Sequence, residues 1–149
     1  MSAGEYCNRE VVVVSKSEPV SEAISLMRSH HVGDVVVVES TEKGMIPLGI
    51  LTDRDIVLEI LAEGVELDAV SIGDVMSYEL TTVTQDTKLI DTIKLMRDDG
   101  VRRIPVVNQQ GVLEGLLSMD DILELLAEQL TDIVGLINKE QNRESRQRR

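Results

Sequence analysis

Apolar positions follow two kinds of spacing along the chain, and the same order of spacings occurs twice. In the first copy, a short apolar run at residues 11–14 is followed by apolar positions at helical spacing over residues 20–27. A second apolar run covers residues 35–38, and a polar loop turns the chain back into residues 48–51. A further helical pattern starts at Asp53. This order predicts a strand, a helix, a hairpin of two strands and a second helix.

The second half of the chain repeats the first. Residues 80–107 align with residues 11–38 without a gap, and residues 115–123 then align with residues 49–57. Small and polar residues stay in register, which two merely aliphatic stretches would not preserve: Gly49 with Gly115, Thr52 with Ser118, and Asp55 with Asp121. Neither copy alone would bury a sufficient core, so we expect the two to pack face to face.

These patterns predict an α/β (α+β) fold built from two β-α-β-β-α repeats. We expect the first repeat to span residues 7–66 and the second residues 77–131, with residues 67–76 as the linker between them. Residues 132–149 are expected to form a helical extension that ends in a polar, basic tail.

Composition narrows the classes of function. The formal net charge of −12 opposes binding to a nucleic-acid backbone or an anionic membrane, and the two aromatic residues offer no stacking platform for bases. No apolar run approaches the ~18 residues of a membrane span, and the first residues lack the pattern of a signal peptide. Cys7 is the only cysteine, which excludes an internal disulfide and favours a reducing compartment. We therefore expect a cytoplasmic protein.

The segments that begin at Thr52 and Ser118 carry the most informative polar residues. Each follows a predicted strand, and each places a hydroxyl at the start of a helix with Asp55 or Asp121 three residues on. Two interpretations are open. The pattern matches a helix capping box, although that motif prefers Glu or Gln at its last position. Alternatively, the hydroxyl and the helix start contact a phosphate while the carboxylate accepts hydrogen bonds from a ribose diol.

A second candidate segment lies where the hairpin of the second copy begins. Arg102 and Arg103 are adjacent cations in an acidic protein, and they are either solvated surface charges or the source of a positive field for a phosphate. Ile104 and Pro105 would add a rigid apolar wall for a base. The first copy has Gly and Asp at the equivalent residues 33–34, which predicts two unequal sites or a single one.

The sequence offers binding groups but no catalytic machinery. It contains no G-x-S-x-G segment, no glycine-rich phosphate loop that ends in Lys-Ser/Thr, and no recognisable Cys/His pair. His30 and His31 lack companions at metal-ligand spacing. We therefore expect neither an enzyme nor a metal site.

Taken together, the repeat, its spacing and its motifs resemble a tandem pair of cystathionine-β-synthase (CBS) domains, also called a Bateman module. The resemblance covers roughly residues 7–130. Its most specific parts are the paired G-h-h-[ST]-x-x-D segments at residues 49–55 and 115–121, the segment 96–107, and the linker residues 72–76.

This resemblance implies two repeats stacked about a pseudo-twofold axis, with two clefts between their sheets. The ligands implied are AMP, ADP, ATP or S-adenosylmethionine, and no resident cofactor is required. By position, Asp55 and Asp121 would hold ribose hydroxyls, while Thr52 and Ser118 would contact ribose or phosphate.

For the second candidate segment, the resemblance assigns Arg102 and Arg103 to phosphate, and Ile104 with Pro105 to the two sides of the adenine. The first copy departs from the family pattern at residues 33–36, where a basic residue and a proline would be more usual. Its site is therefore expected to differ from that of the second copy.

The function implied is a sensor that binds an adenine nucleotide, forms a homodimer and regulates a separate, unidentified protein. The alternative is a structural dimerisation module whose motifs only cap helices. An apolar stripe at Leu130, Ile133, Val134 and Ile137 has no equivalent in the first copy, and either covers the module's own core or forms a dimer seam.

Overall fold

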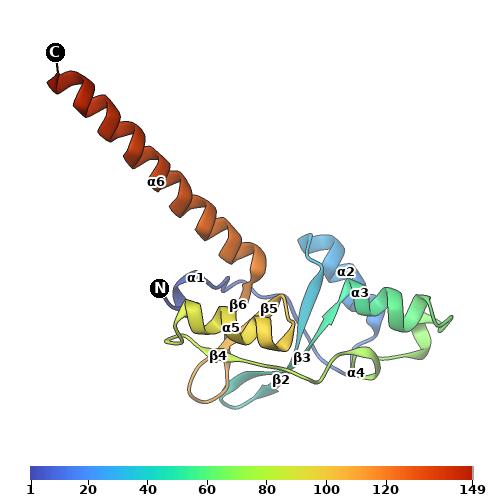
Figure 1. The fold of residues 1–149 in the computed structure, drawn as a ribbon. Helices are drawn as coiled ribbons and strands as arrows, with labels where there is room; N and C mark the ends of the chain where they lie inside the picture. The colour runs from blue at the N-terminus through green and yellow to red at the C-terminus, as the bar shows by residue number, and fades with distance from the viewer. Residues whose placement is uncertain (149) are drawn as a thin grey trace.

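A computed structural model describes residues 1–148 and confirms the mixed α/β fold of two repeats (Figure 1). Each repeat contributes a three-stranded sheet, in which the first strand pairs with the second in parallel and the second with the third antiparallel. Val13 lies opposite Val36 in one sheet, and the equivalent Val83 lies opposite Val106 in the other. The strands are β1 (Val13–Val14), β2 (Asp34–Thr41), β3 (Gly44–Thr52), β4 (Val83–Thr84), β5 (Arg103–Val107) and β6 (Leu113–Ser118).

The first helix of each repeat turns back into the sheet through a left-handed residue. Helix α2 (Val20–His30) ends at His31, with φ of 54°, and α5 (Leu89–Asp99) ends at Gly100, with φ of 66°. Glycine adopts this conformation without steric cost, whereas a residue with a Cβ is strained there. The first repeat therefore carries backbone strain that the second avoids.

The second helices of the two repeats differ in length and regularity. In the first repeat, α3 (Asp53–Ile56) continues as a π-helical segment, η1 (Val57–Leu61). In the second, α6 (Met119–Gln147) is one continuous helix that includes the predicted basic tail as far as Gln147.

Each repeat has its own apolar core, and each core is completed by a segment from elsewhere in the chain. Ile72 and Met76 pack in the first core, and Ala3 packs in the second. Ile72 and Ala3 begin two short equivalent helices, α4 (Ile72–Val75) and α1 (Ala3–Tyr6), and Met76 directly follows α4. The predicted linker is thus largely structured, and it also contains a 3₁₀ turn, η2 (Leu67–Ala69).

Helix α6 extends well beyond the two sheets into open space (Figure 1). The apolar side chains along it are 45–66% exposed, namely Leu123, Leu126, Leu130, Ile133, Val134, Leu136 and Ile137. The stripe at Leu130, Ile133, Val134 and Ile137 therefore does not cover the module's own core. Across residues 1–148, no helix combines the length and apolar character that a membrane crossing requires.

Candidate functional site

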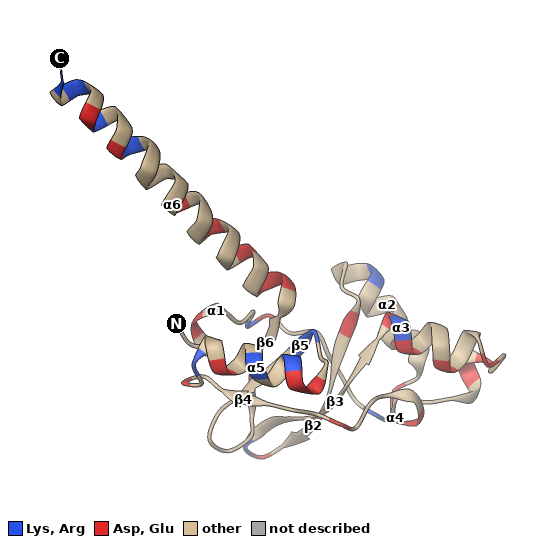
Figure 2. Ribbon diagram, in the orientation of Figure 1, with Lys and Arg blue, Asp and Glu red and all other residues tan. Residues whose placement is uncertain are grey.

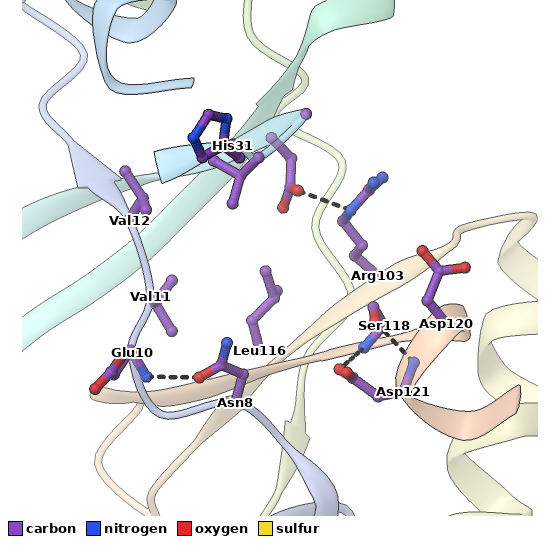
Figure 3. Close-up of a pocket in the computed structure, with 13 residues that line it drawn as sticks. Asn8, Glu10, Val11, Val12, His31, Arg103, Leu116, Ser118, Asp120 and Asp121 are labelled. Carbon is purple, nitrogen blue, oxygen red and sulfur yellow. Dashed lines mark hydrogen bonds and ion pairs between the residues drawn. The ribbon is translucent and has the colours of Figure 1, made fainter. Parts of the chain in front are cut away.

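Two clefts lie between the repeats. Cleft 1, with a volume of about 270 Å³, is formed by residues 31–34 of the first repeat, residues 118–121 of the second, and the segment 8–12 that precedes β1. Figure 3 shows Ser118, Asp120 and Asp121 on one side of it, with His31 on the other. Residues 11–12 line this cleft, and β1 contains only the last two residues of the predicted strand, Val13 and Val14.

Cleft 2 is built from the equivalent parts of the opposite repeats. It has a volume of about 460 Å³ and is lined by residues 52–55, residues 101–103 and the segment 77–81 that precedes β4. Each of these three parts occupies the position in cleft 2 that its repeat equivalent occupies in cleft 1. The internal repeat therefore generates two related clefts, whose linings differ in their side chains.

The two strand-to-helix junctions form capping boxes with nearly identical geometry. The backbone N–H of Asp55 donates to Thr52 Oγ1 at 3.1 Å, and the N–H of Thr52 donates to Asp55 Oδ2 at 3.0 Å. At the second junction, the corresponding distances between Ser118 and Asp121 are both 3.1 Å. The objection that Asp reaches poorly in a capping box is therefore wrong for this chain.

Capping does not remove these residues from the clefts. Thr52 and Asp55 are half-buried and line cleft 2, and Ser118 and Asp121 are half-buried and line cleft 1. In each Asp, only Oδ2 takes part in the cap, and Oδ1 accepts no hydrogen bond from residues 1–148. The two interpretations of the motif are thus compatible, because the cap uses one carboxylate oxygen and each Asp also lines a cleft.

The two candidate arginines have different environments. Arg102 is exposed, lines cleft 2 and forms no ion pair with the rest of the described chain. Arg103 lines both clefts, and its Nε lies 2.8 Å from Oδ1 of Asp34 in the opposite repeat (Figure 3). Arg102 is therefore unpaired among the described residues, whereas Arg103 is held by Asp34.

Asp34 is the buried member of this ion pair. Its side chain is 10% exposed, and its Oδ2 is buried with no hydrogen-bond partner among the described residues. Burial raises the pKa of Asp34 above its usual value, and the nearby Asp53 adds to this effect, while Arg103 opposes it. The carboxylate is consequently costly to keep charged, and Arg103 is its one close cationic partner in the described structure.

Ile104 and Pro105 are not brought together with the other candidate residues. Both side chains are fully buried, Ile104 within the second core, and neither lines cleft 1 or cleft 2. They lie within β5, where the alternation of the strand directs successive side chains to opposite faces of the sheet.

That the segments before β1 and β4 line the two clefts was not predicted from the sequence. Asn8 and Ser77 occupy equivalent positions there, and each pairs with the third strand of a sheet at Leu116 or Ile50. The sequence contains a signal for this, because residues 2–8 (SAGEYCN) match residues 71–77 (SIGDVMS) at the same offset as the main repeat. Within residues 1–148, no group of three or more His, Cys, Asp or Glu side chains is placed to hold a metal ion.

Comparisons with known proteins agree on one family. A model described as "CBS domain" matches residues 3–62 and 72–128. The protein MK0525 of Methanopyrus kandleri is 38% identical over 125 residues, which cover 84% of this chain and 62% of that relative. CBS domain-containing protein YhcV of Bacillus subtilis is 36% identical over 121 residues, covering 81% of this chain and 82% of that protein. The chain thus spans less than two thirds of the first relative and most of the second.

A solved structure also resembles the chain in fold. The cytosolic domain of the Mg²⁺ channel MgtE, crystallised in complex with ATP, superposes with a TM-score of 0.69 at 26% sequence identity. The match covers 83% of this chain and 48% of that one.

Proposed function

Because the chain belongs to the CBS domain family, we propose that it is a regulatory module that binds an adenine nucleotide in cleft 2. The family's general role supports a regulatory protein rather than an enzyme, and the ATP complex of the MgtE cytosolic domain supports a nucleotide as the ligand class. AMP, ADP and S-adenosylmethionine share the adenosine group of ATP, and they are the further candidates.

Cleft 2 offers the groups that a nucleotide needs. Asp55 Oδ1 is available to accept hydrogen bonds from a ribose diol, and Thr52 lies beside it at the start of the helix. Arg102 lies across the same cleft with its guanidinium unpaired in the described structure. The observation that carries the proposal is that Arg102, unpaired among the described residues, lines the same cleft as Thr52 and Asp55.

Further roles follow for the remaining candidate residues. We assign Ser118 and Asp121 the same contacts with a ribose in cleft 1. Arg103 remains a candidate for phosphate, although it must first leave Asp34. Adenine contacts by Ile104 and Pro105 stay a prediction, and they would have to act through the backbone of β5 because their side chains are buried.

The experiment is calorimetric titration of the whole chain with AMP, ADP, ATP and S-adenosylmethionine. Arg102→Ala is expected to weaken nucleotide binding about tenfold or more, since a hydrogen bond to a charged group contributes about 1.5–3 kcal/mol. Arg28→Ala is the matched control, because Arg28 is exposed on α2 and lines neither cleft. No heat and no thermal shift with any of the four ligands would contradict the proposal and favour a structural dimerisation module.

We also propose that the chain forms a homodimer through α6 and transmits ligand binding to a separate protein. Charge favours an antiparallel pair of these helices. Residues 120–132 carry only acidic charges, while basic residues outnumber acidic ones in residues 139–148 (Figure 2). Antiparallel pairing places the acidic part of one helix beside the basic part of the other, whereas parallel pairing would align like charges.

A further inference from the structure

We propose that cleft 1 is a second, distinct site that takes a nucleoside without phosphate, and that Asp34 is the residue that excludes phosphate from it. The inference rests on the proposed binding of a nucleotide in cleft 2. The two clefts are formed by equivalent backbone segments and differ in the charges of their side chains.

The charges that line the two clefts differ. Cleft 1 is lined by four acidic residues, and Arg103 is the one Lys or Arg in its described lining. Cleft 2 is lined by three acidic residues and three arginines. The acidic residues of cleft 1 are Glu10, Asp34, Asp120 and Asp121. A phosphate that enters cleft 1 therefore meets an excess of negative charge that cleft 2 lacks.

Asp34 also removes the one arginine that cleft 1 could use. The Arg103 guanidinium is held at 2.8 Å from Asp34 Oδ1, and the second carboxylate oxygen is already buried without a partner. If Arg103 turned to a phosphate in cleft 1, a buried carboxylate would lose its cationic partner while a second anion arrived next to it. Such a change is unfavourable twice over, because a buried charge needs a partner and like charges repel.

The same ion pair places no such restriction on cleft 2. Arg102 can contact a phosphate there without breaking any ion pair within residues 1–148. Cleft 2 is also the larger of the two, at about 460 Å³ against 270 Å³. The nucleotide with its phosphates therefore belongs in cleft 2.

The class of ligand for cleft 1 follows from the strand-to-helix junction that it shares with cleft 2. Ser118 and Asp121 reproduce the junction of Thr52 and Asp55, with one carboxylate oxygen again free of hydrogen bonds in the described chain. This junction suits a ribose diol, and the surrounding acidic groups favour an uncharged or cationic substituent on it. Adenosine and S-adenosylmethionine share this chemistry, and separate titrations distinguish them.

The experiment counts ligands per chain by calorimetry with AMP as the probe. The wild-type chain is expected to bind one AMP, and Arg102→Ala is expected to weaken that site. Asp34→Asn removes the negative charge of residue 34 and leaves Arg103 without its ion-pair partner. A second AMP is then expected to bind in cleft 1, at least about tenfold more tightly than AMP binds in cleft 1 of the wild type. Asp91→Asn, an exposed change on α5, is the control for a general change in charge.

A second measurement keeps the inference testable if Asp34→Asn fails to fold. With AMP saturating cleft 2, adenosine or S-adenosylmethionine is expected to bind once more per wild-type chain, and Ser118→Ala is expected to weaken that event. Two equal AMP sites in the wild type, or no additional nucleoside binding at saturating AMP, would overturn the inference and leave the proposed function standing. The absence of binding by every ligand would overturn both.

Discussion

Asp34 and Arg103 occupy equivalent positions in the two repeats and form an ion pair with each other across the pseudo-twofold relationship. Their atoms Oδ1 and Nε are 2.8 Å apart, and Arg103 lines both clefts. The same charged residue at both positions would place two like charges together, so the ion pair depends on a difference between the two repeats. The contact joins the two halves at the point where both candidate sites meet.

The burial of Asp34 predicts a specific pH dependence of stability. Because its pKa is raised in the folded state, the folded protein binds this proton more tightly than the unfolded chain, and stability falls as the pH rises from the ordinary value of 3.8 through the raised one. Asp34→Asn removes this contribution. The unfolding free energy of Asp34→Asn minus that of the wild type, both measured in urea, should therefore be larger at neutral pH than at a pH below 3.8.

A difference between the variant and wild type that stays constant over this pH range would contradict the raised pKa of Asp34. Asp91→Asn serves again as the control, because Asp91 is exposed on α5 and its replacement should leave the pH profile unchanged.

Gly49 and Gly115 allow the segments before β4 and β1 to approach the sheets closely. A Cβ at Gly49 would collide with the carbonyl oxygen of Ser77 and lie 2.5 Å from Met76 Cε. A Cβ at Gly115 would lie 2.5 Å from Cys7 Sγ. Either glycine replaced by alanine should lower the unfolding free energy by about 1–3 kcal/mol, as overpacking does.

Gly135→Ala is the control for these two substitutions. Nothing lies within 4 Å of a Cβ at Gly135, which is in the exposed part of α6, so alanine should stabilise that helix by up to about 1 kcal/mol. Equal effects at all three glycines in a urea titration would contradict the close approach.

The two capping residues provide a matched pair that separates stability from binding. Thr52→Ala and Ser118→Ala should each lower the unfolding free energy by about 1 kcal/mol, because each removes the acceptor for one backbone N–H at a helix start. Only Thr52→Ala should also weaken AMP binding, since Thr52 lines cleft 2. Equal loss of AMP affinity in both variants would argue against cleft 2 as the nucleotide site.

Cys7 should react slowly with thiol reagents in the folded protein. Burial raises the pKa of its thiol above the ordinary value of 9.0, although the neighbouring Arg9 acts in the opposite direction. The reactive thiolate is thus less abundant than in an unfolded chain. Modification by a disulfide reagent, followed with and without urea at constant pH, should be faster in urea, and equal rates would contradict the prediction.

The exposed stripe of α6 should control the oligomeric state. The double substitution Leu130→Glu with Ile137→Glu is expected to convert a dimer to a monomer, as measured by light scattering on a sizing column. Ile90→Glu is the matched control, because Ile90 is 65% exposed and Leu130 is 64% exposed, but Ile90 lies on α5. A monomeric wild type, or a dimer that survives the double substitution, would contradict the pairing of α6.

The amino-acid sequence by itself determined the repeat, the order of the strands and of the two main helices in each copy, and the two junctions at Thr52 and Ser118. These features depend on periodicity and on residues a few positions apart, so local pattern is sufficient to reveal them. The equivalent strand pairings, Val13 with Val36 and Val83 with Val106, then follow, because the two repeats have similar sequences and form similar sheets.

Only the tertiary structure decided which residues meet across the repeats. It paired Asp34 with Arg103, packed Ala3 and Ile72 into the two separate cores, buried Ile104 and Pro105, and left α6 exposed beyond Leu125. Such contacts join residues far apart in the chain, and their energies depend on burial and on the approach of groups from another element. No periodic pattern records that information, and it appears only when the two repeats are placed against each other.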